Sequence, residues 1–187
     1  MQPIILASQS PRRRQLLEWA EIPFTVRVSN TDESYPPDLP LEDIAIFIAR
    51  QKALAVQQGV GEETVILAAD TIVVLGGRVI GKPRDRDEAI GILQDLSGNR
   101  HTVITGVVIR KGDAESAFAD RTEVAFHPLT RAQIEYYVDT YQPYDKAGAY
   151  AIQEWIGVVG IQSVQGDFYN VMGLPVSRVV QELERFG

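Results

Sequence analysis

The chain contains no cysteine among its 187 residues. Disulfide bonds and thiolate metal sites are therefore excluded, and nothing in the composition points to an oxidising compartment. Histidine is scarce too: His101 and His127 are the only two, and neither has another histidine at metal-ligand spacing. We interpret both as structural residues. Ser8 and Ser10 have no histidine nearby to activate them, which disfavours a serine-nucleophile mechanism.

Long apolar runs are also missing. No stretch approaches the ~18–20 residues needed to span a bilayer, and the opening MQPIILAS lacks the charged region of a signal peptide. We therefore expect a soluble, cytoplasmic protein with no membrane partner. Positive charge is in deficit, because 18 Lys and Arg face 25 Asp and Glu, a net charge of -7. This balance argues against a nucleic-acid binder, although a local arginine cluster can still hold a small anion.

The chain does contain alternating strand and helix patterns, in a length that fits one domain (1–187) with two lobes around a cleft. Apolar or alternating runs predict strands at 3–8, 24–29, 64–75, two within 101–129 and one around 157–166. Amphipathic segments predict helices at 11–20, 41–58, 85–97, 130–140 and 175–186. An acidic, proline-rich loop (30–40) and a hairpin return (76–83) separate them. We expect an α/β fold whose mixed sheet is flanked by helices.

The segment LASQSPRRRQLL, residues 6–17, passes from a strand through Ser8 and Ser10 into a helix that begins at Pro11. Free backbone N–H groups at a helix N-terminus favour an anion, and Arg12 and Arg13 add bidentate donors suited to phosphate. The alternative is a solvated basic turn with one arginine paired to a surface carboxylate. From these residues alone both interpretations stay open.

Asp70 interrupts the apolar run LAADTIVV. A carboxylate inside such a strand must be hydrogen-bonded, paired or bound to a cation. It could act as a general base on water or as a metal ligand. The alternative is an aspartate that caps a neighbouring helix or ties down a loop.

Three further charged residues are candidates for a site. Lys52 falls on the apolar stripe of the 41–58 helix, so its side chain either points into a cleft or snorkels to the surface. Glu33 lies in the acidic loop, where its oxygens suit Mg²⁺ or Mn²⁺ unless they are simply solvated. Lys82 follows a short strand in GKP, a position typical of a solvated turn as well.

The segment PYDKAGAYAIQ, residues 143–153, combines small residues with Asp145, Lys146 and Gln153. Glycine and alanine allow a ligand to approach the backbone closely, and the Gln153 amide could read a base edge. A tight turn with small packing residues is the alternative.

In this order, ASQSPRRRQLL, ARQKA, AADTIVV, GKP, YDKAGAYAIQ and DFYNVMGLPV resemble the Maf family of nucleotide pyrophosphatases over essentially the whole chain. The resemblance implies a long central sheet similar to that of inosine-triphosphate pyrophosphatases. It also implies hydrolysis of nucleoside triphosphates to monophosphate and pyrophosphate, supported by a divalent metal, Mg²⁺ or Mn²⁺. The form of YDKAGAYAIQ is similar to the subgroup acting on dTTP and UTP.

The family roles carry over to matching positions. Asp70 would be the catalytic acid/base, and Asp70 and Glu33 would bind the metal. The implied substrate-binding residues are Ser8, Arg12, Arg13, Glu33, Lys52, Thr71, Lys82 and Gln153, of which Arg12, Thr71 and Gln153 match positions associated with base selection. The chain departs from the family pattern in a third consecutive arginine, and Trp155 and Gln162 stand where variation could alter the base pocket.

A function of another class stays open beside the enzyme: a nucleotide-binding regulator of cell division or septum formation. Asp70 favours the enzyme, because a pure binding module has little reason to place a carboxylate against a triphosphate. A nucleotidyltransferase is disfavoured by the missing Gly-rich loop. Tyr136 and Tyr137 give a weak hint of a homodimer, although they fit a core equally well.

Overall fold

The computed structural model describes residues 3–28 and 30–186. Its strands are β1 (Ile4–Leu6), β2 (Phe24–Val26), β3 (Ile66–Leu75), β4 (Arg78–Ile80), β5 (Arg100–Lys111), β6 (Ala114–Phe126) and β7 (Ile161–Gln165). Its α-helices are α1 (Pro11–Trp19), α2 (Leu41–Gln57), α3 (Arg86–Leu96), α4 (Arg131–Tyr141), α5 (Trp155–Gly160), α6 (Phe168–Met172) and α7 (Val176–Leu183). Two short 3-10 helices, η1 (Ala147–Ala149) and η2 (Glu184–Phe186), complete the list.

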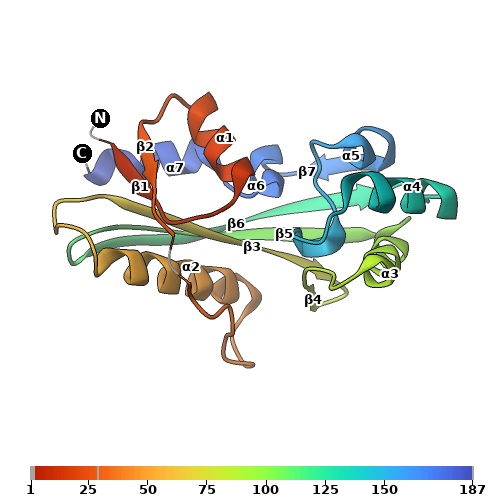
Figure 1. Ribbon diagram of the computed structural model, residues 1–187, viewed down its shortest axis with the longest axis horizontal. Helices are drawn as coiled ribbons and strands as arrows, with labels where there is room; N and C mark the ends of the chain where they lie inside the picture. Colours follow the sequence, from red (N-terminus) through yellow and green to blue (C-terminus); the bar gives the residue numbers. More distant parts are fainter. Residues whose placement is uncertain (1–2, 29, 187) are drawn as a thin grey trace. The chain divides into compact units, whose positions relative to one another are not determined.

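The strands form one sheet in the order β2-β1-β3-β5-β6-β7, with β4 paired to β3 (Figure 1). Strand β1 runs parallel to both β2 and β3, whereas β4 is antiparallel to β3 and β7 is antiparallel to β6. The sheet is therefore mixed and is flanked by helices, which confirms the predicted fold class. None of the helices in the described part of the chain is long and apolar enough to cross a membrane.

The chain divides into two compact units. The first comprises the described residues of Met1–Thr71, Thr105–Asp120 and Gly173–Gly187. In it, α2 covers one face of the strands while α1 and α7 lie on the other face (Figure 1). The small residues Ala49 and Ala53 of α2 pack with Ile5, Ile66 and Val108 of the strands, so the helix lies close against the sheet.

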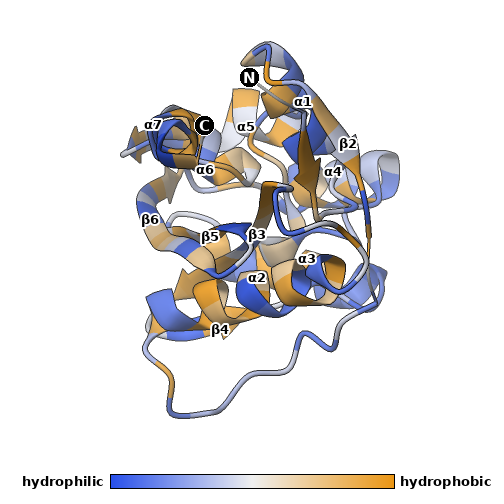
Figure 2. Ribbon diagram, turned by 90° about the vertical axis from the view of Figure 1, so that its left-hand side faces the viewer, coloured by the Kyte–Doolittle hydropathy of each residue, from blue (hydrophilic) through white to orange (hydrophobic). Residues whose placement is uncertain are grey.

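The connection from β2 to α2 is long and mostly hydrophilic (Figure 2). It carries Glu33, and it reaches α2 without a side-chain cap, because Pro40 occupies the N-cap position. Glu42 and Asp43 place negative charge in the first turn instead, and this charge stabilises the helix by interacting with the positive end of its dipole. The loop was predicted from its acidic and proline-rich composition. Residue 29, the last of the predicted strand 24–29, lies outside the described residues.

The second unit comprises Ile72–Ile104 and Arg121–Met172. Its core is centred on Val73, Val103 and Val124 from three strands of the sheet. Helix α4 starts with a complete capping box, in which Thr130 and Gln133 satisfy each other's backbone N–H groups. The start of this helix agrees with the predicted range 130–140. The predicted hairpin return is the β3–β4 connection, which turns through Gly76 and Gly77 at positive φ.

One predicted strand is wrong in part. Only Ile161–Gln165 of the segment 157–166 is a strand, because the residues before it form α5. At Gly157 an added Cβ would lie 1.7 Å from the carbonyl oxygen of Ile152, so the chain folds back tightly there. The short apolar run WIGVVG fits a strand and a helix equally well by periodicity. Helix α6 was also missed, since the sequence predicted only a turn between β7 and α7.

Candidate functional site

The turn between β1 and α1 has the local structure that the sequence predicts. Ser10 is the N-cap of α1, and its hydroxyl accepts the backbone N–H of Arg13 at 3.4 Å. Pro11 follows as the first helical residue, where no N–H is needed. The Ser8 hydroxyl accepts the N–H of Ser10 at 3.2 Å, which fixes the turn before the helix starts. Both serines therefore shape this helix N-terminus.

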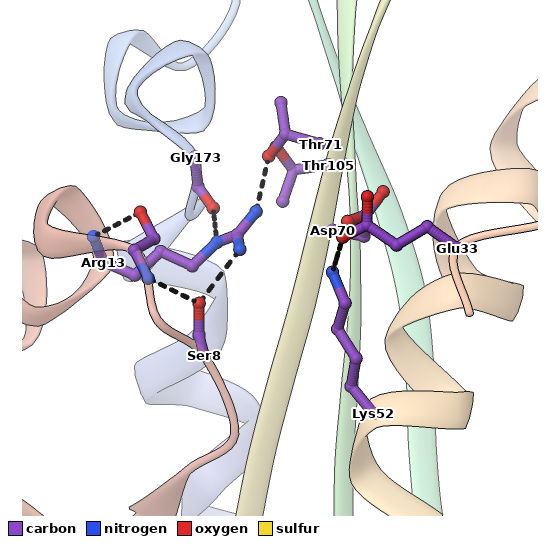
Figure 3. A network of polar contacts seen from close by, with 9 residues as sticks. Ser8, Arg13, Glu33, Lys52, Asp70, Thr71, Thr105 and Gly173 are labelled. Atoms are coloured by element: carbon purple, nitrogen blue, oxygen red, sulfur yellow. Dashed lines mark hydrogen bonds and ion pairs between the residues drawn. The ribbon is translucent and has the colours of Figure 1, made fainter. Parts of the chain in front are cut away.

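Arg13 points inward from this turn and is only 8% exposed. Its guanidinium donates to the Gly173 carbonyl at 2.7 Å, to the Ser8 hydroxyl at 3.1 Å and to the Thr71 hydroxyl at 2.9 Å (Figure 3). These three acceptors come from segments that are far apart in sequence. The side chain thus fastens the β1–α1 turn to β3 and to the segment before α7. A contact of Arg13 with phosphate stays a prediction.

Burial lowers the pKa of Arg13 to about 10. The negative charges of Asp70 and Glu33 act in the opposite direction, and the positive charge of Arg12 adds to the lowering. The guanidinium remains charged at neutral pH. Arg13 therefore interacts electrostatically with both carboxylates.

Asp70 and Thr71 are consecutive in β3 and belong to different networks. Successive side chains of a strand point to opposite faces of the sheet. Thr71 accordingly meets Arg13 and Thr105 on one side of β3, while Asp70 meets Lys52 on the other side (Figure 3). Four other predicted site residues of the first unit are therefore gathered at one stretch of β3, but from both faces: Ser8, Arg13, Glu33 and Lys52.

On the second face, one ammonium group holds two carboxylates. Lys52 Nζ lies 2.7 Å from Asp70 Oδ1 and 3.0 Å from Glu33 Oε1. The lysine and aspartate side chains are 16% and 13% exposed, whereas Glu33 is 48% exposed. Lys52 thus points from the apolar stripe of α2 toward β3 rather than snorkelling away. Asp70 has the cationic partner that a carboxylate in an apolar strand requires.

The donor set decides what metal this face could hold. Within residues 3–28 and 30–186, no three His, Cys, Asp or Glu side chains are grouped as a metal site. Mg²⁺ commonly binds through one or two carboxylates and completes its shell with water and substrate phosphates. Glu33 and Asp70, joined through Lys52, fit that mode and do not fit an all-protein cage. The metal assignment of these two residues stays a prediction.

The second unit holds Lys82 and Gln153. Both side chains are exposed. The carbonyl of Gly81 accepts the N–H of Gly148 at 3.2 Å, so the loop of Lys82 and the 143–153 segment are adjacent. Gly148 has a φ of +73°, and a Cβ there would approach Val73 to 2.9 Å. Only glycine fits this contact, which gives the small residues of the segment a packing role.

Two residues of the Arg13 network were not predicted. Thr105 is fully buried in β5, and its hydroxyl lies 2.8 Å from that of Thr71. Gly173 supplies the carbonyl for Arg13 and has a φ of +120°. A threonine inside the apolar run VITGVVI of β5 is a signal for the first. The sequence carries no comparable signal for a backbone acceptor.

The predicted structural role of His101 is confirmed. It is 2% exposed, stacks on Phe126 and shares a hydrogen bond of 2.5 Å with the Tyr150 hydroxyl. Burial lowers the pKa of His101 to about 4 and raises that of Tyr150. The imidazole is therefore neutral at physiological pH. Among the tyrosines of α4, Tyr137 is fully buried, whereas Tyr136 is 51% exposed.

Comparison with known proteins gives a consistent result. A family model described as "Maf-like protein" matches residues 3–186. A dTTP/UTP pyrophosphatase of Cytophaga hutchinsonii is 52% identical over 182 residues, which cover 97% of this chain and 83% of that protein. Proteins of the same name from Bacteroides fragilis and Parabacteroides distasonis are 47% and 48% identical, covering 97% and 98% of this chain and 95% of each relative.

The similar solved structures are more distant. A HAM1 protein from Coxiella burnetii has a TM-score of 0.45 and 17% identity, and covers 67% of this chain and 73% of its own. A nucleoside-triphosphatase, also titled dITP/XTP pyrophosphatase, from Mycobacterium abscessus has a TM-score of 0.39 and 14% identity, and covers 66% and 72%.

Proposed function

Since the chain belongs to the Maf-like protein family, we propose that it hydrolyses nucleoside triphosphates, with dTTP and UTP favoured, to nucleoside monophosphate and pyrophosphate. The observation that carries this proposal is the carboxylate of Asp70, held in β3 at 2.7 Å from Lys52 Nζ. The names of the similar proteins support the substrate class. Such a reaction would remove unwanted nucleotides from the pool.

In the proposed reaction, a water oxygen attacks the α-phosphorus and the bond from that phosphorus to the bridging oxygen breaks. Asp70 accepts the proton of the water, and pyrophosphate leaves with the bridging oxygen. The ammonium of Lys52 is next to Asp70 in the structure. With substrate bound, the same ammonium can turn to a phosphate oxygen, which offsets developing charge and frees Asp70 to take the proton.

Phosphate binding is assigned to the β1–α1 turn. Ser8 lies there with the N-terminus of α1, and Arg12 is half-buried on the first turn of the helix. Arg13 keeps this turn in place through its bonds to Ser8 and Thr71. Lys82 is proposed as a further phosphate contact. Base selection is assigned to Arg12, Thr71 and Gln153, as the family resemblance implies.

We include a divalent metal, Mg²⁺ or Mn²⁺, in the proposal. Glu33 and Asp70 would hold it together with the substrate phosphates. When bound, such an ion lowers the pKa of a coordinated water and polarises a phosphoryl oxygen. In the structure Lys52 links the two carboxylates and so keeps them close together.

The proposal includes the cellular location of the protein and its partners. A cytoplasmic nucleotide pool would supply the substrate, and a net charge of -7 opposes nucleic acid as a partner. The predicted homodimer stays open, but only Tyr136 of the two tyrosines named for it is exposed. A regulator of cell division is not favoured, because the similar proteins are named as pyrophosphatases.

The test is a hydrolysis panel of natural and modified triphosphates, run with Mg²⁺ and with Mn²⁺. We expect dTTP and UTP to give monophosphate and pyrophosphate. Asp70→Asn should lower kcat by about 10²-fold or more while nucleotide binding persists, since only the proton acceptor is lost. Asp113→Asn, at the exposed β5–β6 turn, is the matched control. Release of orthophosphate from the wild type would rule out this reaction.

A further inference from the structure

The segment Ala151–Glu154 carries Gln153, and a single buried hydroxyl group holds both of its ends. We propose that Tyr137 of α4 is a positioning residue that fixes the Gln153 amide and so sets the base preference. This inference rests on the proposed pyrophosphatase function. All of the residues involved belong to the second unit, so the argument needs only contacts within that unit.

The hydroxyl of Tyr137 makes two hydrogen bonds. It accepts the backbone N–H of Ala151 at 3.1 Å and donates to Glu154 Oε2 at 2.5 Å. These partners are the first and last residues of the segment. One oxygen atom therefore holds both ends of the four-residue segment that carries Gln153.

The tyrosine is itself firmly placed. Tyr137 is fully buried, and its ring stacks on Tyr141 with centroids 5.0 Å apart. Glu154 also faces Lys146 Nζ at 3.8 Å, and Lys146 is 2.8 Å from Asp145. Lys146, a polar residue of the 143–153 segment, thus forms an ion pair with Glu154. A charge-assisted network in a buried environment costs more to break than an exposed one.

Neighbouring contacts hold the same segment from its other sides. Tyr150, directly before Ala151, is bonded to the buried His101. Ile152 is 5% exposed, and its carbonyl is so close to Gly157 that no Cβ fits between them. Gln153 alone of these consecutive residues is exposed. The backbone on each side of Gln153 is thus fixed, while its amide remains accessible.

A fixed backbone at Gln153 limits the positions that its amide donor and acceptor can reach, and discrimination between bases depends on how closely those groups meet the base edge. Replacing Tyr137 with Phe keeps the buried ring and removes only the hydroxyl. The N–H of Ala151 and the carboxylate of Glu154 then lose a partner, and the segment gains freedom. Asp70 belongs to the other unit, and we expect its chemistry to be unaffected by this change.

The experiment compares Tyr137→Phe with the wild type on dTTP, UTP, CTP and dATP. We expect KM for dTTP to rise about tenfold with kcat changed less than about twofold, and the preference for dTTP over CTP to fall by a similar factor. Tyr136→Phe makes the same chemical change on the exposed side of α4 and should leave both values unchanged. A lower melting temperature with unaltered selectivity would overturn the inference.

Gln153→Ala provides a second test. If Tyr137 acts through Gln153, then Tyr137→Phe in the Gln153→Ala background produces no further loss of selectivity. Additive losses would contradict the inference.

Should Tyr137→Phe fail to fold, Glu154→Gln replaces it, because the amide keeps an acceptor oxygen for the hydroxyl. Glu154→Gln should retain more base selectivity than Glu154→Ala. Equal losses of selectivity in the two variants would contradict a role for the Tyr137–Glu154 hydrogen bond. A wild type that hydrolyses none of the four overturns the proposed function itself, a different outcome.

Discussion

Arg13 shows how one buried residue can hold three separate segments of the chain together. Its guanidinium joins the β1–α1 turn, β3 and the segment before α7 through three hydrogen bonds. A lysine could not do the same, because an ammonium group lacks the planar fork that reaches separate acceptors in fixed directions. The arginine therefore contributes to stability as well as to the shape of the turn.

Arg13→Lys should lower the free energy of unfolding by about 3 kcal/mol, because buried hydrogen-bond acceptors lose a charged donor. Urea denaturation at neutral pH measures the difference. Arg14→Lys, on the same helical turn, should cost less than about 1 kcal/mol. An Arg13→Lys protein of wild-type stability but without activity would instead indicate that Arg13 binds the substrate directly.

His101 makes a pH-dependent contribution to stability. Its pKa is about 4 in the folded chain and about 6.5 in an unfolded one. Between these values the unfolded state binds the proton more strongly, so this contribution is complete above pH 6.5 and is lost as the pH falls toward 4. We expect the wild type to lose about 3 kcal/mol more than His101→Gln across this range. Parallel denaturation curves for the two proteins would contradict this assignment.

At the scale of the elements, α2 and β5 of the first unit approach each other closely at a glycine. A Cβ at Gly106 of β5 would lie 2.3 Å from the backbone of Ala45 and Ile46 in α2. The helix can rest on the strand only because this position has no side chain. Since α2 carries Lys52, the approach also sets the distance from that ammonium to Asp70.

Gly106→Ala should destabilise the protein by several kcal/mol, about 3 or more, because the helix must move away from the strand. Activity should fall in whatever folded protein remains, because Lys52 moves with α2. Gly91→Ala is the matched control: a Cβ there meets nothing within 4 Å in the middle of α3. It should stabilise the protein by about 0.5–1 kcal/mol. Thermal unfolding followed by circular dichroism measures both, and a neutral Gly106→Ala would refute the close approach.

At the scale of the whole molecule, an acidic protein is proposed to bind a polyanion. The chain carries a net charge of -7, so the proposed attraction must come from local arginines and lysines and from the proposed metal. Two carboxylates without a third ligand make a weak metal site by themselves. Metal and nucleotide should therefore bind with positive coupling, each raising the affinity for the other.

A non-hydrolysable dTTP analogue at 100 times its dissociation constant, with Mg²⁺, should stabilise the protein by about 2.7 kcal/mol. Millimolar Mg²⁺ alone should shift the melting temperature very little, and the analogue with a chelator should shift it less than the pair. Differential scanning fluorimetry compares the three conditions. A large stabilisation by Mg²⁺ alone would show that the protein holds the metal without substrate.

The sequence by itself determined most of the elements and their ends. Ser10 with Pro11, and Thr130 with Gln133, start helices through contacts within four residues. Such local interactions can be read from the chain directly. The Maf resemblance likewise depends on motifs that are visible in sequence, and the family match confirms it. The short apolar run of α5 was assigned wrongly, because six residues do not distinguish a helical period from a strand.

Only the tertiary structure decided which side chains meet. The bond from Arg13 to Gly173 joins residues 160 positions apart, and that to Thr71 joins residues 58 apart. No local pattern encodes such pairings, because they depend on how the strands are ordered in the sheet. Tertiary packing also turned Lys52 toward Asp70 and set Thr71 against Arg13 on the opposite face of β3. The packing of α4 against the segment after η1 placed the Tyr137 hydroxyl between Ala151 and Glu154.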